Sequence, residues 1–66
     1  MKNGLYLAAR ETKDWIVKVK SIEEGLEIIK GFEVIDKKEN AFVEDFYCII
    51  EVNDGTLYNA EILDVQ

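Results

Sequence analysis

The sequence predicts an α+β domain in which an antiparallel sheet of four to five strands packs on one amphipathic helix, in the order ββαβββ. Three observations support this fold class. Apolar and polar residues alternate in segments 5–10 and 15–20, apolar residues recur with helical spacing in segment 22–30, and Asp54-Gly55 is a strong hairpin turn signal. A chain of 66 residues has room for a single domain, which we expect to span residues 1–66.

The first twenty residues have the pattern of a β-hairpin. Two alternating segments, 5–10 and 15–20, flank the polar stretch 11–14. In the first segment Leu5, Leu7 and Ala9 share one side. In the second, Trp15, Val17 and Val19 share one side, which we expect to be part of the core.

A short amphipathic helix is expected over residues 22–30. Ser21 and Glu24 form a capping box at its start, and Gly31 stands where a left-handed C-cap would end it. Ile22, Leu26 and Ile29 lie on its apolar side and are expected to be buried against the sheet.

The second half of the chain is expected to be mostly β-structure. Residues 32–35 read as a short strand, 36–40 as a polar turn, and 42–52 as a long strand interrupted at Glu44-Asp45 by a bulge or bend. A type I′ turn at Asp54-Gly55 would then place Ile49 opposite Ala60 in the last hairpin.

The segment Asn53-Asp54-Gly55-Thr56-Leu57-Tyr58-Asn59-Ala60-Glu61-Ile62-Leu63 resembles the hairpin of Tudor-type and other SH3-like barrels. In those domains, too, a D-G turn precedes an aromatic residue, an alanine and an aliphatic pair. The resemblance covers about a fifth of the chain and implies a small SH3-like barrel as the alternative fold. It also implies a Tudor-like binding module as an alternative function, although the aromatic cage of such domains cannot be assigned here residue by residue.

Composition argues against an enzyme, a metalloprotein and a disulfide scaffold. The chain has no His and one Cys, so it lacks the ligands of structural zinc, a Ser-His or Cys-His nucleophile and a disulfide pair. Adjacent carboxylates such as Glu44 and Asp45 point to opposite faces of a strand and cannot share a substrate. Cys48 lies in an apolar run and is expected to be a small buried hydrophobe. We therefore expect no catalytic residues, no metal and no cofactor.

The charge balance limits the classes of partner. Fourteen acidic and eight basic residues give a net charge of -6, which repels phosphate and disfavours nucleic acid. No segment approaches the roughly eighteen apolar residues of a membrane span, and residues 1–4 begin no signal peptide. We expect a cytoplasmic protein, of a bacterium or of a phage-infected cell, that contacts no membrane.

What remains is a small acidic protein that binds another macromolecule, as an inhibitor or adaptor, through a partner protein with a basic surface. In size and charge, though not in motif, it resembles phage-encoded inhibitors such as anti-restriction and anti-CRISPR proteins. The candidate interaction residues are an acidic helix face and an acidic turn, together with an apolar residue and a lysine of the second strand: Glu23, Glu24, Glu27, Glu33, Asp36, Glu39, Glu44, Asp45, Ile16 and Lys18.

Two further functional classes stay open. A small-ligand binder would need a pocket between helix and sheet. A homo-oligomeric structural protein would bury a sheet edge, and segment 5–9 carries none of the charges that usually protect an edge strand. We therefore expect a homodimer, joined through that edge or through an exposed face around Ile16. The competing arrangement places segment 5–9 inside the sheet, paired on both sides.

Overall fold

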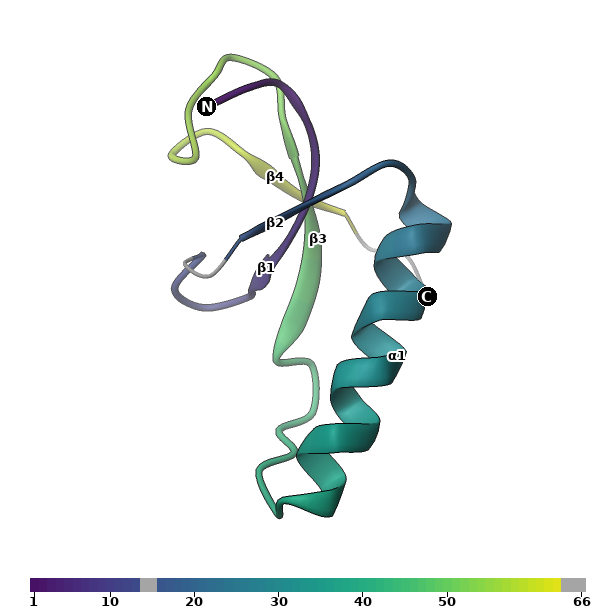
Figure 1. Cartoon of the computed structure of the whole chain (residues 1–66). Helices are drawn as coiled ribbons and strands as arrows, with labels where there is room; N and C mark the ends of the chain where they lie inside the picture. The colour runs from purple at the N-terminus through teal and green to yellow at the C-terminus, as the bar shows by residue number, and fades with distance from the viewer. Residues whose placement is uncertain (14–15, 64–66) are drawn as a thin grey trace.

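The computed structural model describes residues 1–13 and 16–63, so the expected core position of Trp15 lies outside the described residues. Its elements, in chain order, are β1 (Gly4–Ala9), β2 (Val17–Val19), α1 (Ile22–Lys38), β3 (Tyr47–Val52) and β4 (Glu61–Leu63). One helix packs on a four-stranded antiparallel sheet of order β2-β1-β3-β4 (Figure 1). The α+β class is therefore confirmed. The sheet does not close, so the alternative of a barrel is wrong.

Strands β1 and β3 form the centre of the sheet. They pair over six residues, from Gly4 opposite Val52 to Ala9 opposite Tyr47, and β2 pairs with the other side of β1. Segment 5–9 is thus an interior strand, and the expectation that it forms an exposed edge is wrong. An interior strand needs no protecting charge, because both its rows of backbone groups are already paired.

Both faces of the sheet are covered. On one face α1 packs so closely that a Cβ on Gly25 would stand 2.9 Å from Cδ1 of Ile49. The other face carries a buried cluster of six residues: Tyr6, Ala8, Cys48, Ile50, Val52 and Ala60. Ile16, from the β1–β2 connection, and Leu57, from the β3–β4 connection, both pack against this cluster. Lys13 Nζ also donates to the Ala60 carbonyl at 3.4 Å, which ties the two connections together.

Helix α1 is much longer than its sequence pattern indicates. Its start is as expected, since the Ser21 hydroxyl accepts a hydrogen bond from the Glu24 N–H at 3.1 Å. It then continues through Gly31 to Lys38 and ends at the C-cap Glu39. The predicted C-cap at Gly31, the strand 32–35 and most of the turn 36–40 are therefore wrong. The helical spacing continues on the sheet side through Phe32, whose ring lies 5.6 Å from that of Tyr47.

The long strand predicted for residues 42–52 is only half formed. Regular pairing begins at Tyr47, and Glu44-Asp45 form a turn in which Asp45 has a φ of 58°. The bend at Glu44-Asp45 is confirmed, but residues 42–43, just before it, do not form a strand. A left-handed residue takes the backbone out of the extended conformation, so pairing cannot continue through it.

The connection between β3 and β4 is eight residues long, and the predicted two-residue hairpin is wrong. Gly55 has the positive φ expected of it, 77°, but Asp54 does not. The Asp54 carboxylate instead accepts hydrogen bonds from Thr56 N and Oγ1 and from Asn59 Nδ2, at 3.1, 2.8 and 2.6 Å. These bonds build a wider loop. Ile49 consequently pairs with Leu63, and Ile50 with Ile62, in place of the predicted Ile49–Ala60 register.

Candidate protein-interaction surface

About half of the residues of helix α1, nine of seventeen, are exposed. All seventeen of its residues are described, and only Gly25 among them is buried. Its first turns lie beside the sheet, whereas its last turns run beyond the sheet, next to residues 40–46 (Figure 1). The helix therefore presents most of its length as accessible surface.

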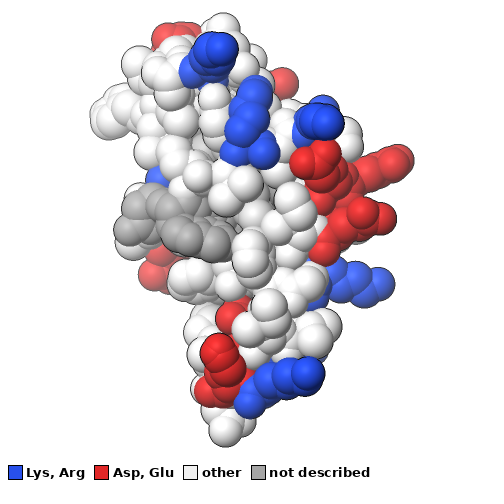
Figure 2. Space-filling model, viewed as in Figure 1, with Lys and Arg blue, Asp and Glu red and all other residues white. Residues whose placement is uncertain are grey.

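Acidic side chains gather where α1 begins. Glu23 and Glu27 are exposed, and Glu24 is half-buried. Carboxylates near a helix N-terminus are stabilised by the helix dipole. Figure 2 shows an acidic protrusion over this part of the molecule, with basic side chains to either side of it. Glu23 and Glu27 of the predicted acidic face are therefore accessible on the surface.

Apolar side chains of α1 are also exposed. Val34 and Ile35 are 55% and 52% exposed, and Leu26, expected in the core, is 39% exposed. Gly25 faces the sheet closely, and Leu26, the next residue, is rotated by about 100° around the helix axis from it. Leu26 therefore lies on the flank of the helix, while Ile22 and Ile29 are half-buried.

Asp36 is engaged within the fold. Its Oδ2 accepts a hydrogen bond of 2.7 Å from the Tyr47 hydroxyl, and the Tyr47 ring also packs edge-on against Phe46 at 5.0 Å. Burial, followed by the hydrogen bond and the negative charge of Asp36, raises the pKa of Tyr47 to about 12. Asp36 therefore links α1 to β3 and is less available to a partner than its sequence position indicates.

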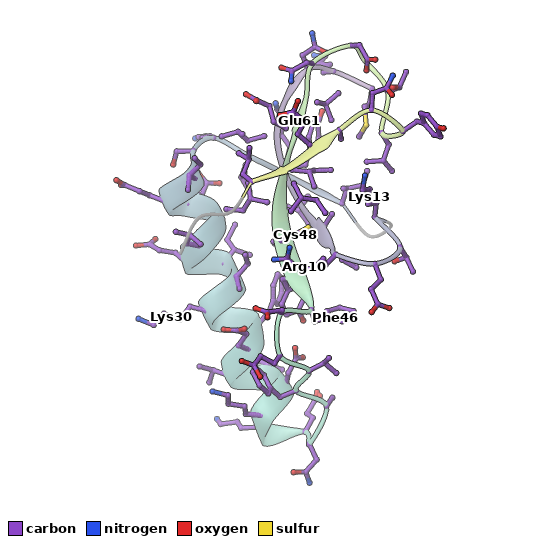
Figure 3. The ribbon with its side chains drawn as sticks, turned by 180° about the vertical axis from the view of Figure 1, so that it is seen from behind. Arg10, Lys13, Lys30, Phe46, Cys48 and Glu61 are labelled. Carbon is purple, nitrogen blue, oxygen red and sulfur yellow. The ribbon has the colours of Figure 1, made fainter. Side chains whose placement is uncertain are left out.

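Cys48 behaves as expected from the sequence. It lies on β3 (Figure 3), and its side chain is buried. Burial raises the pKa of the thiol, although the charges of Arg10 and Lys13 partly oppose this effect. A buried thiol with a raised pKa is a poor nucleophile at neutral pH.

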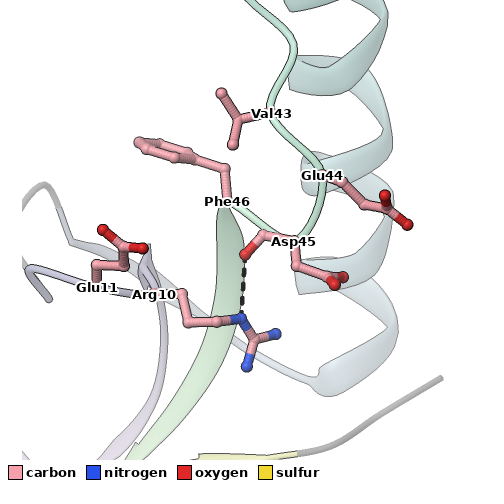
Figure 4. Close-up of a pocket in the computed structure, with 6 residues that line it drawn as sticks. All are labelled: Arg10, Glu11, Val43, Glu44, Asp45 and Phe46. Carbon is pink, nitrogen blue, oxygen red and sulfur yellow. Dashed lines mark hydrogen bonds between the residues drawn. The ribbon is translucent and has the colours of Figure 1, made fainter.

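The acidic turn lies far from the acidic start of the helix. Glu44 and Asp45 follow α1, whereas Glu23 begins it, and a helix of this length spans about 25 Å. The turn borders a shallow pocket of about 330 Å³, lined also by Arg10, Glu11, Val43 and Phe46 (Figure 4). There Arg10 Nε donates to the Asp45 carbonyl at 3.0 Å. The structure therefore does not bring the two acidic groups into one surface.

The remaining predicted residues are dispersed. Glu33 is half-buried on α1, and Glu39 is its exposed C-cap. Ile16 is half-buried against the six-residue cluster on the face of the sheet opposite α1, so the expected exposed face around it is wrong. Lys18 is exposed, and its Nζ lies 4.8 Å from the centre of the Tyr6 ring and donates to the Asn3 carbonyl at 3.2 Å.

Some exposed apolar residues lie outside the strands that the sequence pattern predicts for them. Phe42, Val43 and Phe46 belong to the irregular segment before β3, and Val34 and Ile35 to the helix. Continued helical spacing beyond Gly31 was the signal that could have placed the last two on α1.

The described residues contain no group of three or more His, Cys, Asp or Glu side chains arranged to hold a metal ion. In the same part of the chain, no helix has the length and apolar character needed to cross a membrane. Comparison of the chain with known families, curated proteins and solved structures found no match.

Proposed function

We propose that the protein binds another protein, one with a basic surface, and acts as an inhibitor or adaptor without catalysing a reaction. The observation that supports this function best is the exposure of α1, in which Gly25 alone is buried among seventeen described residues. Nine of these seventeen residues are exposed, so the helix is well suited to presenting side chains to a partner.

The residues on α1 are of the kinds that combine in protein interfaces. Apolar side chains such as Val34 supply contact area at the centre of an interface, and charged side chains around it supply complementarity and faster association. Glu23 and Glu27 favour a basic partner, and the net charge of -6 adds attraction at long range. Inhibition of a nucleic-acid-binding enzyme, by occupying its basic groove, is one form that this function would take.

The test is capture of partners from a bacterial lysate on the immobilised protein, at low and at high salt. The parent should capture its partner at low salt and lose it at high salt, because screening weakens exposed charge pairs. Replacing both Glu23 and Glu27 by Gln should abolish capture at low salt, because it removes the charges that attract the partner. The matched control is Glu11→Gln with Glu61→Gln, which removes two exposed carboxylates away from α1. Equal loss in both double variants, or capture indifferent to salt, would contradict the proposal.

A further inference from the structure

Five residues of α1 form a continuous line along one side of the helix, which we name the Gly31 stripe. They are spaced alternately four and three residues apart and comprise Glu24, Ile28, Gly31, Ile35 and Lys38. This alternation is the repeat that keeps one line of side chains facing a second helix. Gly31, at the middle of the stripe, lies about 120° around the helix axis from Gly25, which faces the sheet.

The middle of the stripe is open. Gly31 is exposed, and a Cβ placed on it would have nothing within 4 Å. Ile35 is 52% exposed, and Ile28 is half-buried. The fold itself therefore gives no steric reason for a glycine here, where alanine would favour the helix. A glycine between two isoleucines does permit the backbone of another helix to come close.

The charges at the two ends of the stripe are complementary to each other. Glu24 lies in the first turn of α1 and Lys38 in the last, and Gly31 is midway between them. If two copies of the helix cross antiparallel at Gly31, Glu24 of each copy faces Lys38 of the partner subunit. Ile28 of each then lies beside Ile35 of the partner subunit. A two-fold axis repeats each contact, so the Gly31 stripe of one copy binds the same stripe of the other.

We propose that a second copy of this chain packs on the Gly31 stripe, forming a two-fold dimer through antiparallel α1 helices. The outer strands are less suitable as an interface, since β2 and β4 have three residues each and β2 carries Lys18. The dimer does not depend on the proposed function. Glu23 and Lys30 lie about 80° and 100° around the helix axis from Gly31, to one side of the stripe.

The experiment is sedimentation equilibrium over a range from micromolar to millimolar protein. The parent should associate, and Glu24→Lys or Lys38→Glu should each weaken the dimer by about tenfold or more, because the two-fold axis doubles the repulsion. An equimolar mixture of these two variants should associate again, since each then supplies the charge that the other lacks. Circular dichroism checks that each variant remains folded.

A matched pair of apolar variants tests the centre of the stripe. Ile35→Lys should prevent association, whereas Val43→Lys should not, although Val43 is equally accessible at 58% exposure. A single 7.6 kDa species for the parent at every concentration would overturn the dimer. So would failure of the mixed charge variants to associate, or equal weakening by Ile35→Lys and Val43→Lys, because either result places the contact elsewhere.

Discussion

Tyr47 joins the helix to the sheet through both its ring and its hydroxyl. The ring lies between Phe32 of α1 and Phe46, and the hydroxyl donates to Asp36. These contacts involve the half of α1 that extends past the strands. Tyr47, at the start of β3, therefore helps to hold the C-terminal turns of the helix in place.

Tyr47→Phe should lower the free energy of unfolding by about 1 kcal/mol, because it removes one hydrogen bond to a charged acceptor and keeps the ring. Urea denaturation at pH 7 measures the loss. Tyr58→Phe is the matched control, since Tyr58 is 91% exposed and its hydroxyl should contribute almost nothing. Equal effects of the two changes would show that the Tyr47–Asp36 bond adds no stability.

The raised pKa of Tyr47 leads us to expect that stability falls at alkaline pH. The pKa of Tyr47 is about 12 in the folded chain against the ordinary tyrosine value of 10.0, so the folded state holds the proton more tightly than the unfolded state. The contribution is complete below pH 10 and is lost as pH rises towards 12. Denaturation midpoints across this range should fall less in Tyr47→Phe than in Tyr58→Phe. Parallel curves would contradict the raised pKa.

At the scale of elements, α1 contains two glycines in opposite surroundings. Gly25 faces the sheet, with the side chain of Ile49 filling the space that a Cβ would need, while Gly31 faces open space. Ile49 is 1% exposed and has little room to move aside. The same substitution should therefore change stability in opposite directions at the two sites.

Gly31→Ala should stabilise the protein by roughly 0.5 to 1 kcal/mol, because alanine loses less backbone entropy in a helix. Gly25→Ala gains the same propensity but overpacks the core, at a typical cost of 1 to 3 kcal/mol, so a net loss of about 1 kcal/mol is expected. Urea denaturation should be run at low micromolar protein, where self-association contributes least. A stabilising Gly25→Ala would mean that the helix sits further from the sheet.

Signals within a few residues of each other predicted the elements well, and signals that depend on distant contacts did not. The Ser21 cap and the alternation of β1 are local and were confirmed. Gly31 looked like a helix end because glycine is common there, yet Phe32 and Asp36 continue the helix through contacts with Tyr47. Asp54 favoured a loop through its bonds to Thr56 and Asn59, and this loop set the register of β4.

For the whole molecule, stability is concentrated in the two central strands. Leu7 and Ile50 are completely buried in β1 and β3, whereas α1 buries only a glycine among its described residues. Local opening free energies follow the number of buried contacts. The strands and the helix should therefore differ in how often their backbone hydrogen bonds open.

Amide hydrogen exchange followed by NMR should show this difference. The slowest amides should be those of β1 and β3 that pair with each other, and the fastest amides within regular structure should be those of the last turns of α1. Residues 53–55 provide an internal comparison, because Gly55 N–H donates to Asn3 Oδ1 at 2.8 Å and should be protected relative to its neighbours. Uniform protection of helix and strands would contradict a centre of stability in the sheet.

The class of fold could be predicted from the pattern of apolar residues, but the order of the strands and the candidate interaction surface could not. Segment 5–9 has no charged residue, which is typical of an unprotected edge as well as of an interior strand. Only its pairing with residues that are roughly forty positions later in the chain distinguishes the two. The sequence likewise predicts an exposed Ile16, because no local signal shows that loops cover the face of the sheet opposite α1.

The central position of β1 has a consequence for synthesis on the ribosome. Strand β1, in the middle of the sheet, is synthesised before its neighbour β3, which is made only after the whole of α1. Until then the β1–β2 hairpin has one free apolar edge, and the helix has no complete sheet to pack on. The nascent chain therefore cannot gain its native stability in stages. The protein becomes stable only when residues 47–52 leave the exit tunnel and close the ladder.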